Sequence, residues 1–406
     1  MNIMQKPIAE SRSGTLGKKL YQPYIDAKWG LKNHWYPAFF SNEFAEGEFK
    51  ATTICAEPIL IRREDGKVYA VEDRCLHRGV KMSIKPHCFK KGTVTCWYHG
   101  FTYGLDDGQL KTIVAAPDDP LIGTVSIKVY PVAEKYGMIF VFVGDADYPT
   151  PPLEEDLPKP LSKDYRYYAP NLTDDNVINL GIRRPGDANW RLAVENGFDP
   201  GHVLIHMKSP YVYASNFKVQ LGSKPISDRA LRFFEEPNSP KGVMNVLGPD
   251  ENGDVHYERV YENKELGLKS KGAIERPAPN TSMWLPGVLR VENFPKQGLN
   301  LYEWYVPTTE DKYEYWELIS FPYSNEEEKA EAIDRFENYY KEAVFFGFNN
   351  DDLWARDAMQ PFYENGVGFD EEKLGTMDAV IVNWRKLVSR HARGIQGPPK
   401  ELGRRR

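Results

Sequence analysis

The 406-residue sequence has little cysteine and no long hydrophobic run. Its four cysteines are too few for a disulfide framework in a chain of this length. No stretch approaches the roughly 20 apolar residues of a transmembrane helix, and the opening segment MNIMQKPIAESRSG lacks the apolar core of a secretory signal. We therefore expect a cytoplasmic protein that does not enter a membrane and whose thiols are free to bind metal.

The sequence also lacks an excess of positive charge. The formal net charge is -6, and only the tail LGRRR, residues 402–406, resembles a basic stretch. Because nucleic-acid binding requires a basic face, we expect no nucleic-acid partner. With 41% hydrophobic and 27% charged residues, the composition is typical of an ordered globular protein, and the length allows two or more domains.

Short β-type runs separated by turns fill residues 35–145. Asp-Gly pairs at 65–66 and 107–108 are typical hairpin turns, so this part is predicted to be a small antiparallel β domain. Five prolines between residues 149 and 160 then indicate a linker. We expect three parts: an N-terminal segment packing on the body (1–34), the β domain (35–148) and a second domain (149–406).

The second domain is predicted to be α+β. It contains a helical patch around 187–207 and strand-like runs at 299–307 and 313–322. A long amphipathic helix follows, with a capping box predicted from Ser324 to Glu327. Its apolar positions recur at three- and four-residue steps: Ile333, Phe336, Tyr340 and Val344.

Two loops of the β domain each offer one cysteine and one histidine. DRCLHRGV contains Cys75 and His77, and TCWYHG contains Cys96 and His99. Zinc also binds mixed thiolate and imidazole ligands, but its knuckles usually pair Cys-x2-Cys with a second pair. One thiolate and one imidazole from each loop favour a two-iron cluster in which the cysteines hold one iron and the histidines the other. The spacing Cys75-x-His77-x18-Cys96-x2-His99 thus favours a Rieske [2Fe-2S] cluster, with structural zinc as the alternative.

The remaining cysteines have no such partners. Cys55 lies in the apolar run TTICAEPIL and is expected to be a small core residue. Cys88 is expected to be a structural residue. Arg78 and Gly79, beside His77, predict that the histidine edge of the cluster lies near solvent.

A second metal site is predicted in NWRLAVENGFDPGHVLIH, residues 189–206. His202 and His206 are four positions apart, and we expect them on one face of a helix that Asp199 caps and Pro200 begins. Val203 stands where the zinc-protease motif HExxH has its glutamate, so that chemistry is excluded. Two imidazoles and one carboxylate are the ligands of non-haem Fe(II) oxygenases. FNNDDLWARDAMQ, residues 348–360, offers the carboxylate from three positions: Asp351, Asp352 and Asp357.

Together these motifs resemble those of the Rieske non-haem iron aromatic-ring-hydroxylating oxygenases, from about residue 20 to 396. Asn196, Asp199, His202 and His206 fit that family's motif N-x-x-D-x-x-H-x3-H. The resemblance implies that Asp352 is the carboxylate ligand. The family has an acidic or amide residue five positions after that ligand, and Asp357 stands at this position. Asp351 is the alternative. It further implies one Rieske cluster and one mononuclear Fe(II) per chain.

The resemblance also implies an assembly. Catalytic chains of this kind form homotrimers that receive electrons from a ferredoxin and, through it, from an NADH-dependent reductase. In such a trimer Asp199 would connect His202 to His99 of the partner subunit. A carboxylate that accepts from two metal-bound imidazoles would orient both. A plain helix cap is the other interpretation of Asp199.

For the substrate, the resemblance implies a fused nitrogen heteroaromatic such as carbazole, oxidised at the carbon beside nitrogen by angular dioxygenation. The carbonyl of Gly197 would accept the substrate N–H, and the region 208–280 would border the pocket. The residues expected to contact the substrate are Gly197, Thr281, Leu289, Val291, Phe294, Leu301, Phe348 and Asn349.

Two other functions remain open at this stage. One keeps both metal sites but makes the enzyme a monooxygenase or demethylase, or a dioxygenase of another aromatic such as an aminobenzoate or aryl ether. The other is a Rieske electron carrier or a zinc-binding structural protein. An electron carrier would need only the first 150 residues, so the second half of the chain argues against it.

Overall fold

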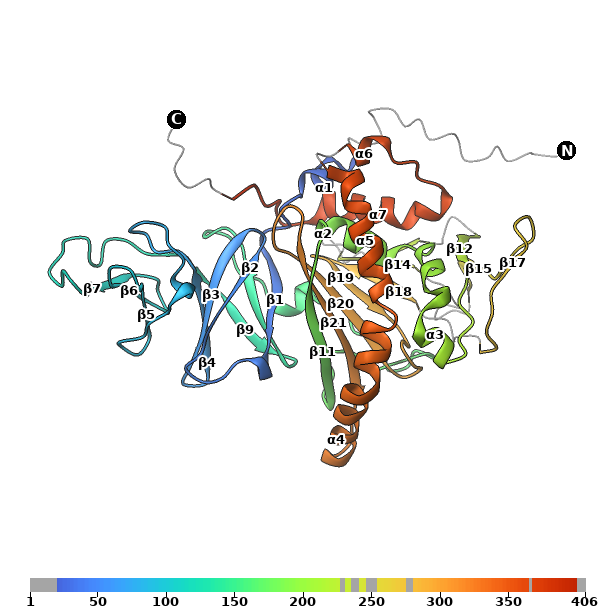
Figure 1. The fold of residues 1–406 in the computed structure, drawn as a ribbon, viewed down its shortest axis with the longest axis horizontal. Coiled ribbons are helices and arrows are strands. Elements are labelled where there is room, and N and C mark those ends of the chain that lie inside the picture. Colours follow the sequence, from blue (N-terminus) through green and yellow to red (C-terminus); the bar gives the residue numbers. More distant parts are fainter. Residues whose placement is uncertain are drawn as a thin grey trace.

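The computed structural model describes residues 20–226, 231–234, 241–245, 254–274, 280–364 and 367–399 (Figure 1). The first 19 residues and the arginine-rich tail lie outside these ranges. Helix α1 (Gln22–Asp26) packs on the body: Tyr24 is fully buried, and its ring makes edge contacts with Trp190 and Phe369. The three predicted parts remain a proposal about which segments fold as units.

The N-terminal β region consists of three small antiparallel sheets. The first has the order β1-β10-β9, from His34–Phe40, Met138–Val143 and Val132–Lys135. The second has the order β2-β3-β4-β8, from Phe49–Ile54, Glu57–Glu64, Lys67–Glu72 and Val129–Tyr130. The third has the order β5-β6-β7, from Thr93–Thr95, Phe101–Gly104 and Leu110–Ile113, and forms one end of the molecule (Figure 1).

The two Asp-Gly turns join neighbouring strands, as predicted. Asp65 and Gly66 both have positive φ angles, 53° and 70°, which a two-residue type I′ turn requires, and they connect β3 to β4. Gly108, between β6 and β7, has a φ of 66°, and a Cβ there would lie 2.1 Å from the carbonyl oxygen of Ile127. Only glycine fits this turn.

The second region is built on a seven-stranded antiparallel sheet with the order β11-β21-β20-β19-β18-β14-β13. Its strands are Val177–Gly186, Tyr313–Pro322, Asn300–Pro307, Val288–Val291, Thr281–Trp284, Gly242–Asn245 and Leu231–Phe234 in that order. Short strands β12 (Gly222–Pro225), β15 (Tyr257–Val260), β16 (Glu262–Asn263) and β17 (Leu268–Lys269) form two separate pairs. The α+β prediction is confirmed.

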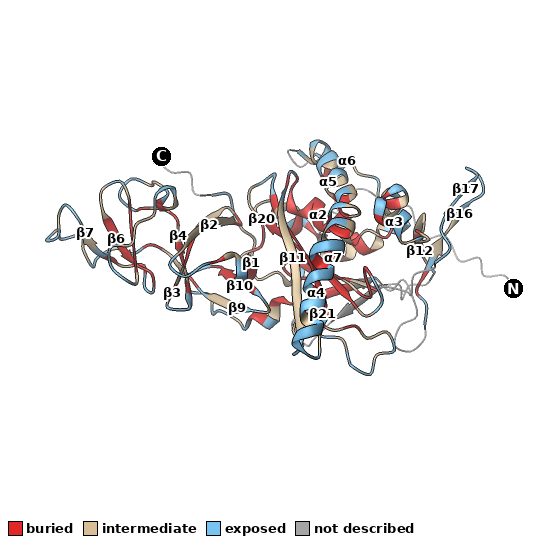
Figure 2. Ribbon diagram, turned by 60° about the horizontal axis from the view of Figure 1, so that its bottom comes forward, coloured by how far each residue is buried: buried red, intermediate tan, exposed pale blue. Residues whose placement is uncertain are grey.

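Every residue of β20 is buried, because both faces of the sheet are covered (Figure 2). Alternating side chains point to opposite faces. Tyr302 and Trp304 pack in one core with residues of β1 and β10, whereas Tyr305 packs with the helices on the other face. The sheet therefore lies between the N-terminal β region and a helical layer, and the polar residues on its helical side are buried.

The helical layer contains α2 (Trp190–Phe198), α3 (Pro210–Ala214), α5 (Asn350–Tyr363), α6 (Gly368–Glu371) and α7 (Ala379–His391). A 3-10 helix, η5 (His202–Lys208), follows α2. Shorter 3-10 turns are η2 (Ser41–Glu43), η3 (Met82–Ile84), η4 (Leu153–Asp156) and η8 (Thr376–Asp378). Among the described residues, no helix is both long and apolar enough to cross a membrane.

The predicted long helix begins one residue away from its predicted position. Helix α4 (Glu326–Arg335) is capped by Asn325, whose side chain accepts from the backbone N–H of Glu328 at 2.9 Å, so the capping box from Ser324 to Glu327 is wrong. The carboxylate of Glu328 reaches back to the backbone N–H of Ser324 instead. Asparagine caps as well as serine does, and here it is the residue with extended backbone.

The same helix continues as the π-helix η6 (Phe336–Phe346). Phe336, Tyr340 and Val344 are buried as predicted, but Ile333 is 40% exposed. The helix therefore packs mainly through its second half, which leads into the segment that carries the predicted carboxylate.

Candidate functional site

The two cluster loops have the same backbone form. In each, a glycine four residues after the cysteine donates its N–H to the cysteine carbonyl: Gly79 to Cys75 at 2.8 Å and Gly100 to Cys96 at 3.0 Å. Both glycines have positive φ angles, 71° and 73°. Each loop therefore turns back between its cysteine and its glycine, with the histidine inside the turn.

The four predicted cluster ligands come together. Cys75 and Cys96 are buried, His77 is exposed and His99 is half-buried, so the histidine edge lies near solvent as predicted. The imidazole centroids of His77 and His99 are 4.5 Å apart. Among the described residues, the buried Nδ1 of His99 has no hydrogen-bond partner. A nitrogen left without a partner in this position fits a metal ligand.

Tyr103 supports the cysteine side of the cluster. Its hydroxyl accepts from the backbone N–H of Leu76 at 3.1 Å, so its proton is available to the sulfur of Cys75 at 3.4 Å. Hydrogen bonds to a cluster sulfur influence its reduction potential. Burial raises the pKa of the Cys96 thiol, so a bound cation is needed to keep a thiolate there at neutral pH.

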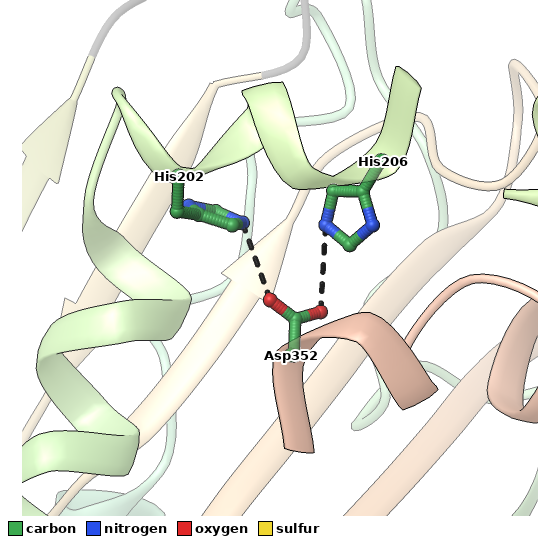
Figure 3. A group of neighbouring side chains, drawn as sticks. All are labelled: His202, His206 and Asp352. Carbon is green, nitrogen blue, oxygen red and sulfur yellow. Dashed lines mark ion pairs between the residues drawn. The ribbon is translucent and has the colours of Figure 1, made fainter. Parts of the chain in front are cut away.

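The predicted iron triad also comes together (Figure 3). Asp352, near the start of α5, has one oxygen 3.5 Å from Nε2 of His202 and the other 3.5 Å from Nε2 of His206. One ligand atom from each of the three residues lies within 4.8 Å of the others. Oδ1 of Asp352 and both ring nitrogens of His206 have no hydrogen-bond partner among the described residues. Two imidazoles and a carboxylate on one side of a point fit Fe(II) with open positions.

The other two carboxylate candidates lie differently. Asp351 Oδ2 is 3.5 Å from Nδ1 of His206, and the side chain of Asp351 is 39% exposed. Asp357 accepts from the backbone N–H of Asp187 at 3.2 Å. Burial alone would raise the pKa of Asp352, but the adjacent imidazoles and the Arg356 guanidinium hold it well below its usual range. Of the three, Asp352 is the one that reaches both histidines.

Asp199 does not cap the helix that was predicted to begin at Pro200. It is the C-cap residue of α2, and the histidines lie on the 3-10 helix η5, which begins at His202. Its side chain accepts from the backbone N–H of Gly201 at 2.7 Å, and burial raises its pKa. Nδ1 of His202 contacts the backbone carbonyl of Asp199, so Nε2 is left for a metal. The bridge to a partner subunit stays a prediction.

A cavity opens beside the triad, and all eight predicted substrate contacts line it. Its wall also includes residues that were not singled out from the sequence: Phe217, Lys218, Gln220, Arg259, Glu303 and Arg356. The first four belong to the region 208–280, expected to border the pocket. The ring of Phe348 stacks on His206 with centroids 3.7 Å apart. The cavity therefore places an aromatic surface beside the predicted iron.

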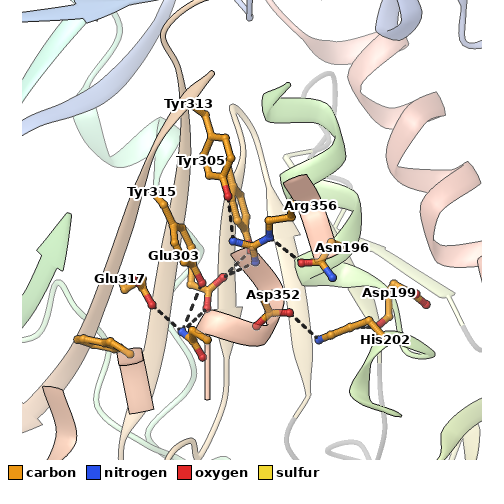
Figure 4. Close-up of polar contacts among 12 residues, drawn as sticks. Asn196, Asp199, His202, Glu303, Tyr305, Tyr313, Tyr315, Glu317, Asp352 and Arg356 are labelled. Carbon is orange, nitrogen blue, oxygen red and sulfur yellow. Dashed lines mark hydrogen bonds and ion pairs between the residues drawn. The ribbon is translucent and has the colours of Figure 1, made fainter. Parts of the chain in front are cut away.

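A buried polar network lies behind the triad (Figure 4). Nε of Arg356 donates to Oδ1 of Asn196 at 2.6 Å, and its guanidinium lies 4.4 Å from the ring centre of Tyr315. Arg356 is four residues after Asp352, hence on the same face of α5. It ties α5, which carries the carboxylate, to α2, which leads into the histidines. The four-residue spacing was the available sequence signal, but its partners come from distant segments.

Comparison with known proteins decides the family. Homotrimeric ring hydroxylases match residues 142–396, and the Rieske [2Fe-2S] domain matches residues 34–131. The chain belongs to the Rieske ring-hydroxylating oxygenases. As a member, it is an oxidoreductase with one Rieske cluster and one mononuclear iron, and the donor sets described above fit both groups.

Several Rieske oxygenases are similar over nearly the whole chain. The terminal oxygenase component of carbazole 1,9a-dioxygenase from a Sphingomonas species is 42% identical, covering 97% of this chain and 98% of that protein. A solved structure of the 2-oxoquinoline 8-monooxygenase component is 44% identical with a TM-score of 0.90, covering 97% of this chain and 93% of that one. A reduced complex between oxygenase and ferredoxin in carbazole 1,9a-dioxygenase has a TM-score of 0.85 at 41% identity, covering 94% of each chain.

Proposed function

We propose that this oxygenase is the terminal component of a multicomponent system that hydroxylates a fused nitrogen heteroaromatic, with angular dioxygenation of carbazole as the leading reaction. The observation that carries this proposal is the cavity beside the triad, whose wall includes Leu289, Val291, Phe294 and Phe348. Apolar and aromatic walls suit a flat ring system. The relatives named for carbazole agree with it.

Gly197 supplies the polar contact that orients the ring. It lies in the last turn of α2, where backbone carbonyls lack intrahelical donors, and it lines the cavity. Its carbonyl accepts the substrate N–H. A Cβ at this position would lie 1.8 Å from the hydroxyl of Tyr305, so only glycine allows α2 to approach the sheet this closely.

The iron groups, when bound, supply the electron and the oxygen activation, and the chain positions the reactants. The contact from Nδ1 to the Asp199 carbonyl fixes the ring orientation of His202. His206 and His202, with a smaller contribution from Arg356, keep Asp352 ionised in spite of its burial. The stacked ring of Phe348 holds His206 in place and, with the other apolar walls, excludes water from the reacting carbon.

A monooxygenase acting on an oxo-substituted quinoline is the second candidate. The cavity wall carries Gln220, Lys218 and Arg259 in addition to its apolar residues. Such donors suit an exocyclic carbonyl oxygen, which carbazole lacks. The similarity to the 2-oxoquinoline 8-monooxygenase component points the same way. This similarity, and not the polar residues, favours the candidate over demethylation of an aryl ether or oxidation of an aminobenzoate.

For its partners, we propose a homotrimer that receives electrons from a ferredoxin and an NADH-dependent reductase. The exposed imidazole of His77 gives a route for electrons into the cluster. The similar oxygenase–ferredoxin complex and the trimeric nature of the matching family support this assembly. A cytoplasmic location fits the NADH supply and the four free thiols.

The test is oxygen uptake with ferredoxin, reductase and NADH, using carbazole and 2-oxoquinoline in parallel and identifying each product. We expect substrate-dependent uptake and a ring-hydroxylated product from one of the two. His206→Ala is the control, because it removes one iron ligand and should abolish product formation. Turnover of an aryl ether or aminobenzoate, with no reaction of either heterocycle, would contradict the proposal.

A further inference from the structure

Two buried carboxyl groups face each other beside the cavity. Glu303 on β20 and Glu317 on β21 are directly opposed in the antiparallel register, and both are buried. The side-chain amide of Asn349 donates to Glu303 at 3.2 Å and to Glu317 at 2.8 Å. The hydroxyl of Tyr315 lies 3.3 Å from the same nitrogen. One nitrogen thus gathers an oxygen of each carboxyl and a hydroxyl that can donate and accept a proton.

The electrostatics of the pair favour one retained proton. Like charges directly opposite on neighbouring strands repel, and burial disfavours the charged form. Burial raises the pKa of Glu303, and burial together with Glu303 raises the pKa of Glu317 to about 7, against the lowering effect of Arg184. Burial and mutual repulsion therefore favour one proton held by the pair up to about pH 7.

Other charged and titratable groups surround the pair without neutralising both acids. On α5, Arg356 lies 3.8 Å from Glu303, beyond hydrogen-bond distance, and Asp352 adds negative charge. On β20, the hydroxyl of Tyr305 donates to Glu303 at 2.5 Å. On β11, Arg184 donates to Glu317 at 2.6 Å.

The pair connects the cavity with the surface. Glu303 lines the cavity. Glu317 is held by Arg184, which also contacts the side chain of Asn350, an exposed residue at the start of α5. The Tyr315 hydroxyl hydrogen-bonds Glu303 and shares the Asn349 amide nitrogen with Glu317, so these groups line the path by which a proton entering beside Arg184 would reach Glu303. No step of the positioning described above uses these acids.

Ring hydroxylation consumes protons. Dioxygenation combines the ring, O2, two electrons and two protons into a diol, and monooxygenation turns the same reactants into one hydroxylated ring and water. The electrons come from the Rieske cluster and its donor, so the protons must come from solvent or from the protein. Apart from Asp352 of the triad, Glu303 is the carboxyl group in the described cavity wall.

We propose that Glu303 and Glu317 form a proton-supplying pair for this oxygenase. The O–H bond of the Glu303 carboxyl breaks, and its proton forms an O–H bond of the hydroxylated product or of water. The pair then regains a proton from solvent beside Arg184, and a second transfer by the same route supplies the other proton of the turnover. The electron balance is unchanged, because only a proton moves. The role of the pair in catalysis rests on the proposed oxygenase function, whereas the presence of a retained proton on the pair does not.

The first test is infrared spectroscopy of the wild-type protein without substrate. A protonated carboxyl group has a C=O stretch that disappears when it ionises. Because the pKa of Glu317 is raised to about 7, we expect this band below about pH 7 and its loss above that pH. The band should be absent in Glu317→Gln. A wild-type spectrum with no carboxyl band titrating in this range would overturn the proposal, whether or not any variant folds.

The second test measures product formed per O2 consumed. Loss of a positioned proton donor should lower the rate of product formation of Glu317→Gln about 100-fold. Hydrogen peroxide should be released instead, with cluster absorbance and iron content unchanged. Wild-type coupling should fall above about pH 7, and the variant should lose this inflection. A variant with the wild-type ratio and pH profile would overturn the proposal.

Glu292→Gln is the matched control. Glu292 is also fully buried with a pKa raised by burial, and it pairs with Arg290 at 3.3 Å. It does not belong to the cavity wall. We expect this variant to keep the titrating band and the wild-type coupling. If the wild-type enzyme hydroxylates no heteroaromatic at all, the proposed function fails, while the infrared result still decides whether the pair holds a proton.

Discussion

At the scale of single residues, neighbouring aspartates differ sharply in their surroundings. Asp352 is 4% exposed and spans His202 and His206, whereas Asp351 is partly exposed and approaches one nitrogen of His206. Of these two aspartates, Asp352 is therefore the one that can reach a metal held by both histidines. Sequence alone left the two as alternatives, because adjacent residues on a helix differ by their direction and not by their type.

We predict that Asp352→Ala loses product formation and the mononuclear iron but keeps the absorbance of the cluster. Removing the anionic ligand weakens that site without touching residues 75 to 99. Metal analysis should find about three irons per chain in the wild type and about two in the variant, with two acid-labile sulfides in both. Asp351→Ala is the matched control and should keep all three; the opposite result would move the ligand assignment by one residue.

The two possible roles of Asp199 require different hydrogen-bonding capacities of its side chain. As the group that accepts from the backbone N–H of Gly201, it can be replaced by asparagine at little cost. As a bridge to His99 of the partner subunit it must accept two N–H donors, and an amide has only one acceptor oxygen.

We therefore predict that Asp199→Asn folds, assembles and keeps its cluster, yet transfers electrons to the mononuclear iron much more slowly. Rapid mixing of the reduced protein with substrate and oxygen measures the rate at which the cluster is oxidised. A wild-type rate in this variant would leave Asp199 as a local structural residue.

At the scale of elements, a buried ion cluster ties the end of the described chain to its beginning. Asp156 of η4 accepts from His34 of β1 at 2.9 Å and from Arg393, beyond α7, at 2.9 Å. The backbone of residues 394–396 also pairs with residues 30–32. These contacts hold the N-terminal β region, the linker and the last helix together.

We predict that Asp156→Asn lowers the free energy of unfolding by about 3 kcal/mol at neutral pH, because it removes the buried negative charge that pairs with Arg393. Burial would raise the pKa of Asp156, but His34 and Arg393 hold it below its usual value. The stabilisation from a carboxyl with a lowered pKa is present above about pH 4 and is lost as the pH falls further. Denaturation at several pH values should show the two proteins converging in acid; a constant difference would contradict this assignment.

The cluster loops were predictable because their ligands lie within short segments whose spacing reflects one backbone turn. The pair His202 and His206 could be predicted for the same reason, but the kind of helix that carries it could not. A run of four residues is compatible with both an α-helix and the 3-10 helix that forms here, and neighbouring packing decides between them. Glu303, Glu317 and Arg356 were missed since their meaning depends on partners from distant strands and helices. On β20 and β21 the hydrophobic pattern indicated strands but gave no sign that buried acids would meet.

At the scale of the whole molecule, the seven-stranded sheet organises the function. One face packs against the N-terminal β region, which carries the cluster, and the other supports the helices that carry the iron triad. The cavity wall is built from both the sheet and the helices. Cluster and oxygenation site are thus fixed to one rigid scaffold, while the bridge through Asp199 would link neighbouring copies in the proposed trimer.

The central claim is that this chain inserts oxygen from O2 into a fused nitrogen heteroaromatic. The most direct measurement uses ¹⁸O2 with the reconstituted system and mass spectrometry of the product. If carbazole is the substrate, we predict that both new oxygen atoms carry the label; if 2-oxoquinoline is the substrate, the single new hydroxyl carries it. Oxygen consumption that yields only hydrogen peroxide, or a hydroxylated product without label from either heterocycle, would contradict the account.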